Sequence, residues 1–231
     1  YHYPRLEMAQ ILLSHGADPY KEKGRGAWNP MHYAIDDERQ DMVELFLGHS
    51  RDKDLLPYVY YAMTENHKDV VPLFEPYVSI SPIHLSCFYG KLDDVKSYLE
   101  QRKDIEARDI GGLSLLQFAV IGEQIEIVDY LIAQGCNVNS KASDGATALH
   151  HAANGNGKGV EMVQRLIAAG ALVDAKDNTN CTPFLYSMSG LSGDLEAAKI
   201  LLKHGADINI QRKSDEDTTL HDAARGNNIH I

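Results

Sequence analysis

The chain has 231 residues, of which 33 are acidic and 22 basic, giving a formal net charge of −11 at pH 7. Its hydrophobic content of 44% is that of an ordinary soluble protein, and no stretch approaches the ~18 consecutive apolar residues that membrane insertion requires. Nucleic-acid binding depends on neutralising phosphates with Lys and Arg, so the acidic balance argues against a nucleic-acid partner and favours a basic or neutral protein partner.

The chain start and the cysteines bear on cellular location. Residues 1–5 lack the basic and then apolar run of a signal peptide. Cys87, Cys136 and Cys181 are odd in number and include no Cys-x-x-Cys pair, which predicts reduced thiols in an intracellular protein. We therefore expect a cytoplasmic protein, and the sequence leaves the nucleus and delivery into a host cell open.

A four-residue motif recurs along the chain. Its copies are Asn29-Pro30-Met31-His32, Ser81-Pro82-Ile83-His84, Ser114-Leu115-Leu116-Gln117, Thr147-Ala148-Leu149-His150, Thr182-Pro183-Phe184-Leu185 and Thr218-Thr219-Leu220-His221. From the second copy onward the fourth positions are 33, 33, 35 and 36 residues apart. A fixed period near 33 residues predicts a stack of helical repeats, which builds an extended surface rather than a catalytic pocket.

Residues 114–146 illustrate the predicted unit. Ser114 is placed to cap a short helix over 118–121, and Gly122 with Glu123 breaks it. A longer helix follows, with an apolar stripe at helical spacing, and Gly135 is placed to end it in a left-handed conformation. The stripe consists of Ile125, Ile127, Val128, Leu131 and Ile132.

The recurring residues resemble the ankyrin repeat family over nearly the whole chain. The match is carried by the motif copies, by alanine pairs such as Ala152-Ala153, and by endings such as Gly205-Ala206-Asp207. The resemblance implies an all-α fold, an α-solenoid of stacked helix-turn-helix repeats with short projecting β-turns. We predict a single array over 1–231. Its units lie near 1–28 (partial), 29–56, 57–80 (degenerate), 81–113, 114–146, 147–181, 182–217 and 218–231 (partial), so the chain starts and stops inside a repeat.

Two departures from the repeat are expected to change the structure. The unit at 57–80 lacks most of the motif, and Pro72 falls inside its second helix, where it would kink or truncate that helix. We therefore predict an irregular joint near 50–80. The loops at 154–158 and 189–193 each carry about two extra residues.

The evenly spaced motif histidines are predicted to be structural. Histidines of this motif bridge neighbouring turns by hydrogen bonds, whereas metal ligands must converge to roughly 2 Å from one ion, which residues in separate stacked units do not do. We therefore predict no metal, no cofactor and no catalytic residue. The histidines are His32, His84, His150 and His221.

One stretch offers a catalytic alternative. The spacing of 150–158 is similar to the Fic-type nucleotidyl transfer motif, but its Pro, Phe and Asp are absent and Lys158 stands in place of Arg. A short motif with these departures is weak evidence, and the repeat register already accounts for the same residues. A catalyst within the array would depend on this stretch.

The family resemblance implies that a partner contacts the projecting turns and the short-helix face on the concave side. Phe88, Tyr89, Ile110, Leu113 and Ile121 are large and apolar where the register predicts exposure, which is typical of interface anchors, with local packing as the alternative. The predicted partner-binding residues are Trp28, Asp36, Asp37, Phe88, Tyr89, Ile110, Leu113, Ile121, Asp144, Asn154, Asn178, Ser189 and Arg225.

The sequence thus predicts a non-enzymatic module that binds a protein or peptide, with no small-molecule substrate. The alternative is a substrate-recruiting domain of a larger enzyme whose catalytic part lies outside these residues. Bacterial host-directed effectors and ubiquitin-ligase receptors are the two classes that the family resemblance suggests.

Overall fold

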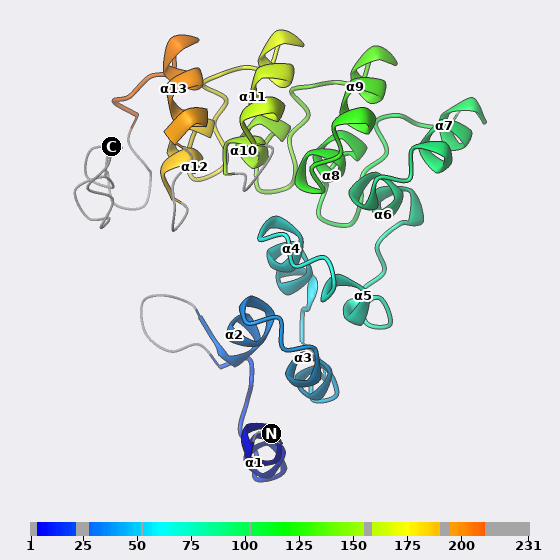
Figure 1. Ribbon diagram of the computed structural model, residues 1–231, viewed down its shortest axis with the longest axis vertical. Helices are drawn as coiled ribbons and strands as arrows, with labels where there is room; N and C mark the ends of the chain where they lie inside the picture. Colours follow the sequence, from blue (N-terminus) through cyan, green and yellow to red (C-terminus); the bar gives the residue numbers. More distant parts are fainter. Residues whose placement is uncertain are drawn as a thin grey trace. The chain divides into compact units, whose positions relative to one another are not determined.

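The computed structural model describes residues 4–21, 28–51, 53–101, 103–154, 159–189 and 195–210. Within these ranges the chain forms thirteen helices and no β-strand, apart from one isolated bridge between Arg108 and Ser114 (Figure 1). The all-α prediction is confirmed. Contacts divide the chain into two compact units, residues 1–79 and residues 80–231, which are described separately below.

The first unit contains five helices: α1 (Pro4–Ser14), α2 (Pro30–Asp36), α3 (Gln40–Leu47), α4 (Leu56–Thr64) and α5 (Val71–Phe74). Two helix pairs, α2 with α3 and α4 with α5, form the repeats, and α1 packs on α3 as the second helix of a preceding unit. The short helices α2 and α4 lie side by side, as do α3 and α5.

The second unit contains four helix pairs: α6 (Pro82–Tyr89) with α7 (Leu92–Glu100), α8 (Leu115–Ile121) with α9 (Ile125–Ala133), α10 (Ala148–Ala153) with α11 (Gly159–Ala168), and α12 (Pro183–Ser189) with α13 (Leu195–Lys203). The first helices α6, α8, α10 and α12 form one row and the second helices form another (Figure 1). This is the stacked helix-turn-helix arrangement that the period predicted.

Local sequence explains where the short helices begin. The Ser114 hydroxyl accepts a hydrogen bond from the Gln117 backbone N–H, and the Gln117 side chain accepts one from the Ser114 backbone N–H. Asn29 caps α2 with its side-chain oxygen. Each reciprocal cap satisfies backbone donors that a helix start leaves unpaired, so the motif sets the start of the helix.

The buried stripe of the second helices forms the core between the two rows. Ile127, Val128 and Leu131 of α9 are fully covered, as the spacing predicted, while Ile125 and Ile132 are half-buried. Full burial of one such side chain contributes about 1.5–3 kcal/mol, so repetition of the stripe is a large stabilising contribution to each pair. Gly135 ends α9 with φ of 85°, as expected.

The degenerate repeat is shortened rather than kinked. Pro72 occupies the first turn of α5, where no intrahelical donor is needed, and the helix is only four residues long. The prediction that Pro72 falls inside the helix was therefore wrong, because the helix begins at this proline rather than being interrupted by it. The boundary between the two compact units follows five residues after this helix ends, at Ser79.

Candidate partner-binding surface

The projecting turns of the second unit are tied together by backbone hydrogen bonds. The Ser143 N–H donates to the Gly111 carbonyl at 3.1 Å, and the Asn178 N–H donates to the Asp144 carbonyl at 2.8 Å. The Asn178 amide also donates to the Ser143 carbonyl at 2.9 Å. Asp144 and Asn178 are exposed, so two predicted contact residues lie on one pre-ordered row of turns.

Buried side chains of the motif link each repeat to the next. Gln117 donates to the Ala146 carbonyl at 3.0 Å, and Nε2 of His150 lies 3.1 Å from the Cys181 carbonyl. Nδ1 of His150 is engaged with Thr147, and burial lowers the pKa of the ring. The prediction of a structural role is confirmed for His150, and likewise for His84, whose ring contacts the Ala107 carbonyl at 3.2 Å.

The structure contradicts the predicted exposure of two of the apolar anchor residues. Phe88 is fully buried and Leu113 is 6% exposed, so the prediction of exposure was wrong for both. Phe88 lies on the side of α6 that meets α8, because its backbone is the closest neighbour of Gly122 at the end of α8. Leu113 directly precedes the capping residue of α8, a position where an apolar side chain typically packs onto the first turn.

The other predicted positions have varied exposure. Ile110 is 73% exposed at the tip of its turn, whereas Tyr89 and Ile121 are half-buried. Asn154 is also half-buried and follows α10. The side chain of Ser189 and all of Arg225 lie outside the described residues.

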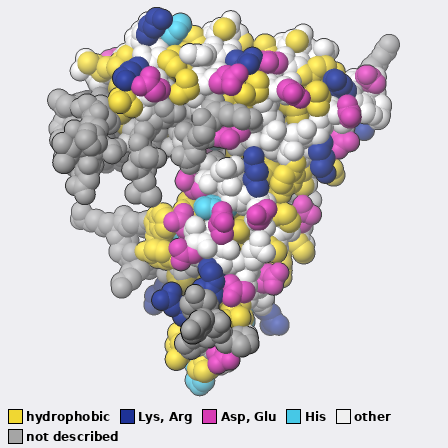
Figure 2. Space-filling view, viewed as in Figure 1, with side chains coloured by type: hydrophobic (Ala, Val, Ile, Leu, Met, Phe, Trp, Pro, Cys, Tyr) yellow, Lys and Arg dark blue, Asp and Glu magenta, His cyan; other side chains and the backbone are white. Residues whose placement is uncertain are grey.

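In the first unit, aromatic and acidic side chains of α2, its flanking residues and α4 meet at one site. The ring centroid of Trp28 lies 5.2 Å from that of Tyr33 and 5.9 Å from that of Tyr61. The Tyr61 hydroxyl donates to Asp36 at 3.0 Å, and Asp37 is exposed beside it. We name these five residues the aromatic–acidic patch. Figure 2 shows apolar and acidic side chains side by side over the middle of this unit.

The charge around the patch is negative. Burial is the main cause that raises the pKa of Glu65; the nearby His67 opposes this shift and Asp36 adds to it. His67 lies between Asp36 and Glu38, with ring nitrogens 3.6 and 3.3 Å from their carboxylates. Asp36 is also the last residue of α2, where the helix dipole adds negative potential. The patch is therefore suited to a cationic group.

Sequence reasoning identified Trp28, Asp36 and Asp37 but missed Tyr33, which is 58% exposed. Tyr61, which is half-buried and contacts two patch residues, was missed as well. The signal available in the sequence was an aromatic residue directly after His32, three positions before Asp36. Neither residue is notable without the contact between α2 and α4.

Two further properties of the described residues bear on function. None of the helices there is long and apolar enough to cross a membrane. In the same ranges, no group of three or more His, Cys, Asp or Glu side chains is arranged to hold a metal ion.

Comparisons with known proteins agree with the repeat structure. A mouse (Mus musculus) RelA-associated inhibitor is 42% identical over 67 residues, 29% of this chain and 8% of that protein. A mouse B-cell lymphoma 3 protein homolog is 28% identical over 148 residues, 64% of this chain and 30% of that protein. The palmitoyltransferase akr1 of Schizosaccharomyces pombe is 35% identical over 63 residues, 27% of this chain and 10% of that protein.

The chain thus spans less than a third of each of these relatives. The family described as ankyrin repeats (3 copies) matches at residues 83–177 and 155–231. These matches together cover more than half of the sequence, and the chain belongs to the ankyrin repeat family.

Proposed function

We propose that this chain is a non-enzymatic binding module that docks a protein or peptide on its short-helix face, with a basic segment of the partner seated on the aromatic–acidic patch. The observation that carries the proposal is the patch itself. Its aromatic rings are partly exposed beside carboxylates, and an Arg or Lys head group can stack on an aromatic face while it pairs with an acid.

The chemistry of the described residues supports binding rather than catalysis. His150, the base that a nucleotidyl transfer motif would need, is fully buried and has both ring nitrogens engaged. Residues 155–158 of that stretch lie outside the described residues. Burial raises the pKa of the Cys87 thiol to about 12 and that of Cys136 to about 11, so both stay protonated at neutral pH and are poor nucleophiles.

A quantitative pull-down with matched tyrosine variants tests the proposal. The wild type and a Tyr33→Ala/Asp36→Asn variant are compared with Tyr77→Ala, which removes a similarly exposed tyrosine of the same unit outside the patch. We expect specific partners to be lost with the double variant, kept with Tyr77→Ala, and released from the wild type by raised salt. Equal recovery by all three proteins would contradict the patch assignment.

A second candidate is a recruiting domain within a larger enzyme. It is favoured by the match to a protein named as a palmitoyltransferase, only a tenth of which aligns with this chain. Sequencing the complete reading frame tests it, because a catalytic domain beside the array would be visible directly.

The cysteines support an intracellular setting for either function. All three lie among the described residues and form no disulfide there, with Cys87 buried and the other two half-buried. Thiols of this kind persist in a reducing compartment, and we propose the cytoplasm. Fractionation of cells that express the native protein checks this assignment.

A further inference from the structure

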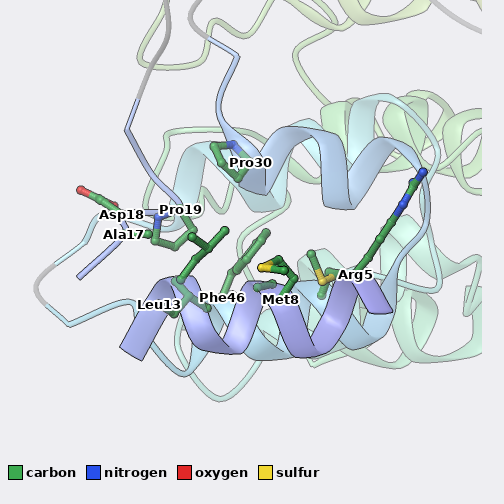
Figure 3. A pocket seen from close by; sticks show the side chains of 11 residues that line it. Arg5, Met8, Leu13, Ala17, Asp18, Pro19, Pro30 and Phe46 are labelled. Atoms are coloured by element: carbon green, nitrogen blue, oxygen red, sulfur yellow. The ribbon is translucent and has the colours of Figure 1, made fainter. Parts of the chain in front are cut away.

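The described residues include an apolar groove in the first unit and a row of positive charges in the second. The groove has a volume of about 490 Å³ beside α1 and is lined by Met8, Leu13 and Phe46 among others (Figure 3). In the complete repeats a short helix packs against its second helix, so an apolar lining beside α1 is a property of the repeat and points to no ligand. The row of charges has no such explanation.

Three exposed cations occupy one position of the repeat in the second unit. Arg108, Lys141 and Lys176 each lie nine residues before the fourth position of the next motif copy, and are therefore 33 and 35 residues apart. We name these three residues the basic row. Arg212 has the same position in the sequence but lies outside the described residues. A row of cations in register with the repeat is notable in a chain with a net charge of −11.

Hydrogen bonds connect successive members of the basic row. The Arg108 guanidinium donates to the Lys141 carbonyl, and also to the Gly112 carbonyl and the Ser140 hydroxyl, both at 2.7 Å. The Lys141 ammonium donates to the Lys176 carbonyl at 2.7 Å. All of these acceptors are uncharged. The bonds therefore hold the cations in line without neutralising them.

The cations keep donors for a further ligand. A guanidinium has five N–H donors and an ammonium three. Arg108 uses three donors and Lys141 one in these bonds, so each keeps two. In the part of the chain that the structure describes, none of the ion pairs includes the basic row, whereas Arg165 and Lys199 of the same unit pair with carboxylates at 2.7–2.8 Å. The basic row is thus pre-ordered for an acidic ligand.

The carboxylates closest in sequence to the basic row are engaged by their own turns. Oδ1 of Asp109 accepts backbone N–H bonds at 3.1 and 2.8 Å, and Oδ1 of Asp177 accepts two at 2.8 Å. Asp144 accepts one at 2.9 Å. Oriented backbone N–H groups carry partial positive charge, which partly offsets these carboxylates. The exposed cations therefore dominate the charge that a ligand along the row meets.

The spacing of the basic row matches a polyproline II segment. The short helices α8, α10 and α12 pack side by side, and packed helices lie about 8–10 Å apart, so one repeat position recurs at about that spacing. A polyproline II helix has three residues per turn and rises about 3.1 Å per residue, which places every third side chain on one face about 9 Å apart. In a β-strand the same-face spacing is about 7 Å, a poorer match.

We propose that the basic row binds an acidic segment of a partner protein in polyproline II conformation, with Asp or Glu at every third residue paired in turn with Arg108, Lys141 and Lys176. Nucleic acid fits less well, because a DNA strand carries a phosphate about every 3.4 Å and the chain as a whole is acidic. The basic row shares no residue with the aromatic–acidic patch, so either proposal can fail without the other.

Fluorescence anisotropy of the full chain with a labelled peptide of four Glu-Pro-Pro units tests the proposal. Proline favours the polyproline II conformation. A second peptide of the same composition groups its four glutamates at one end, and a third carries glutamine instead of glutamate. The variant Lys141→Gln/Lys176→Gln is compared with Lys199→Gln/Lys203→Gln, a matched control that removes two other exposed lysines of the second unit.

We expect the spaced peptide to bind the wild type more tightly than either control peptide at low salt. The loss of two exposed ion pairs in Lys141→Gln/Lys176→Gln should weaken this binding by about threefold to tenfold, and the control variant should bind as the wild type does. Lys141→Glu/Lys176→Glu should instead bind a peptide of four Lys-Pro-Pro units. A purely structural role of the two lysines would not transfer binding in this way. Circular dichroism checks that each variant is folded.

Equal binding of the spaced and grouped peptides would overturn the proposal, as would equal affinity of the two lysine-to-glutamine variants for the spaced peptide. Single-stranded oligothymidine covers the other class of occupant. If it bound more tightly than the spaced peptide and lost that binding in Lys141→Gln/Lys176→Gln, the basic row would be a nucleic-acid site and the proposal would also be overturned.

Discussion

The substitution Gly122→Ala tests how closely the short helices pack. Gly122 caps α8 with φ of −75° and ψ of −4°, a backbone conformation that alanine adopts without strain. A Cβ at this position would nevertheless meet the backbone of Phe88 in α6, with the carbonyl oxygen as the closest atom and the carbonyl and α carbons both at 2.8 Å. Backbone atoms cannot turn aside as a flexible side chain can, so the two helices must separate.

The size of the effect follows from the overlap. Ordinary van der Waals contact begins near 3.4 Å, so α6 and α8 must move apart by roughly 1 Å, and overpacking of this kind typically costs 1–3 kcal/mol. Because a rigid backbone contact is involved, we expect a loss of about 2–3 kcal/mol in the free energy of unfolding of the second unit.

Gly48→Ala is the matched control. Gly48 caps α3 with a similar backbone, φ of −58° and ψ of −17°, and a Cβ there would lie no closer than 3.4 Å to any neighbour. Alanine at such a site should stabilise by about 0.4–1 kcal/mol, because it restricts the unfolded chain. Urea unfolding followed by circular dichroism measures both variants, and effects of the same sign would refute the packing argument.

Three further predictions concern buried polar groups and local stability. Gln117→Ala should cost about 2–3 kcal/mol in urea unfolding, because it leaves the buried Ser114 N–H and Ala146 carbonyl without their partner; an effect below half a kilocalorie would contradict that role. Burial lowers the pKa of His151 to about 4 from its usual 6.5 and also lowers that of His150, so stability is full above pH 6.5 and falls as the pH drops toward 4. His151→Asn should reduce the loss of unfolding free energy between pH 6.5 and pH 4 by about 2 kcal/mol. An unchanged dependence of stability on pH would refute this role of His151. In hydrogen exchange, amides of 56–78 should exchange before those of 115–168, because α5 is only four residues long; equal protection would count against the weaker repeat.

The local structure of this chain could be predicted from its sequence. The reciprocal cap of Ser114 and Gln117, the break at Gly122 and the end of α9 at Gly135 depend on residues within a few positions of one another. Hydrogen bonds to a helix end and the spacing of an apolar stripe are properties of single segments. Their repetition was enough to predict an all-α array with helices paired in order.

The exposure of individual side chains could be predicted from the sequence only in part. The register placed Phe88 and Leu113 on the surface because it treated each short helix as a copy of the same pattern, but the close approach of α6 and α8 buries Phe88. In the patch, Trp28 was identified, whereas Tyr33 and Tyr61 were not. Tyr61 reaches Trp28 and Asp36 from α4, a contact between segments that are distant in the sequence.

The sequence by itself determined which helices form, where they start and end, and which side of each is apolar, because these depend on short-range hydrogen bonds and helical period. Only the tertiary structure decided which apolar sides are covered. Phe88 and Ile121 occupy the same position in their repeats, yet Phe88 is fully buried and Ile121 only half-buried. The physical reason is that burial depends on how closely a neighbouring helix approaches, which a residue's own segment does not specify.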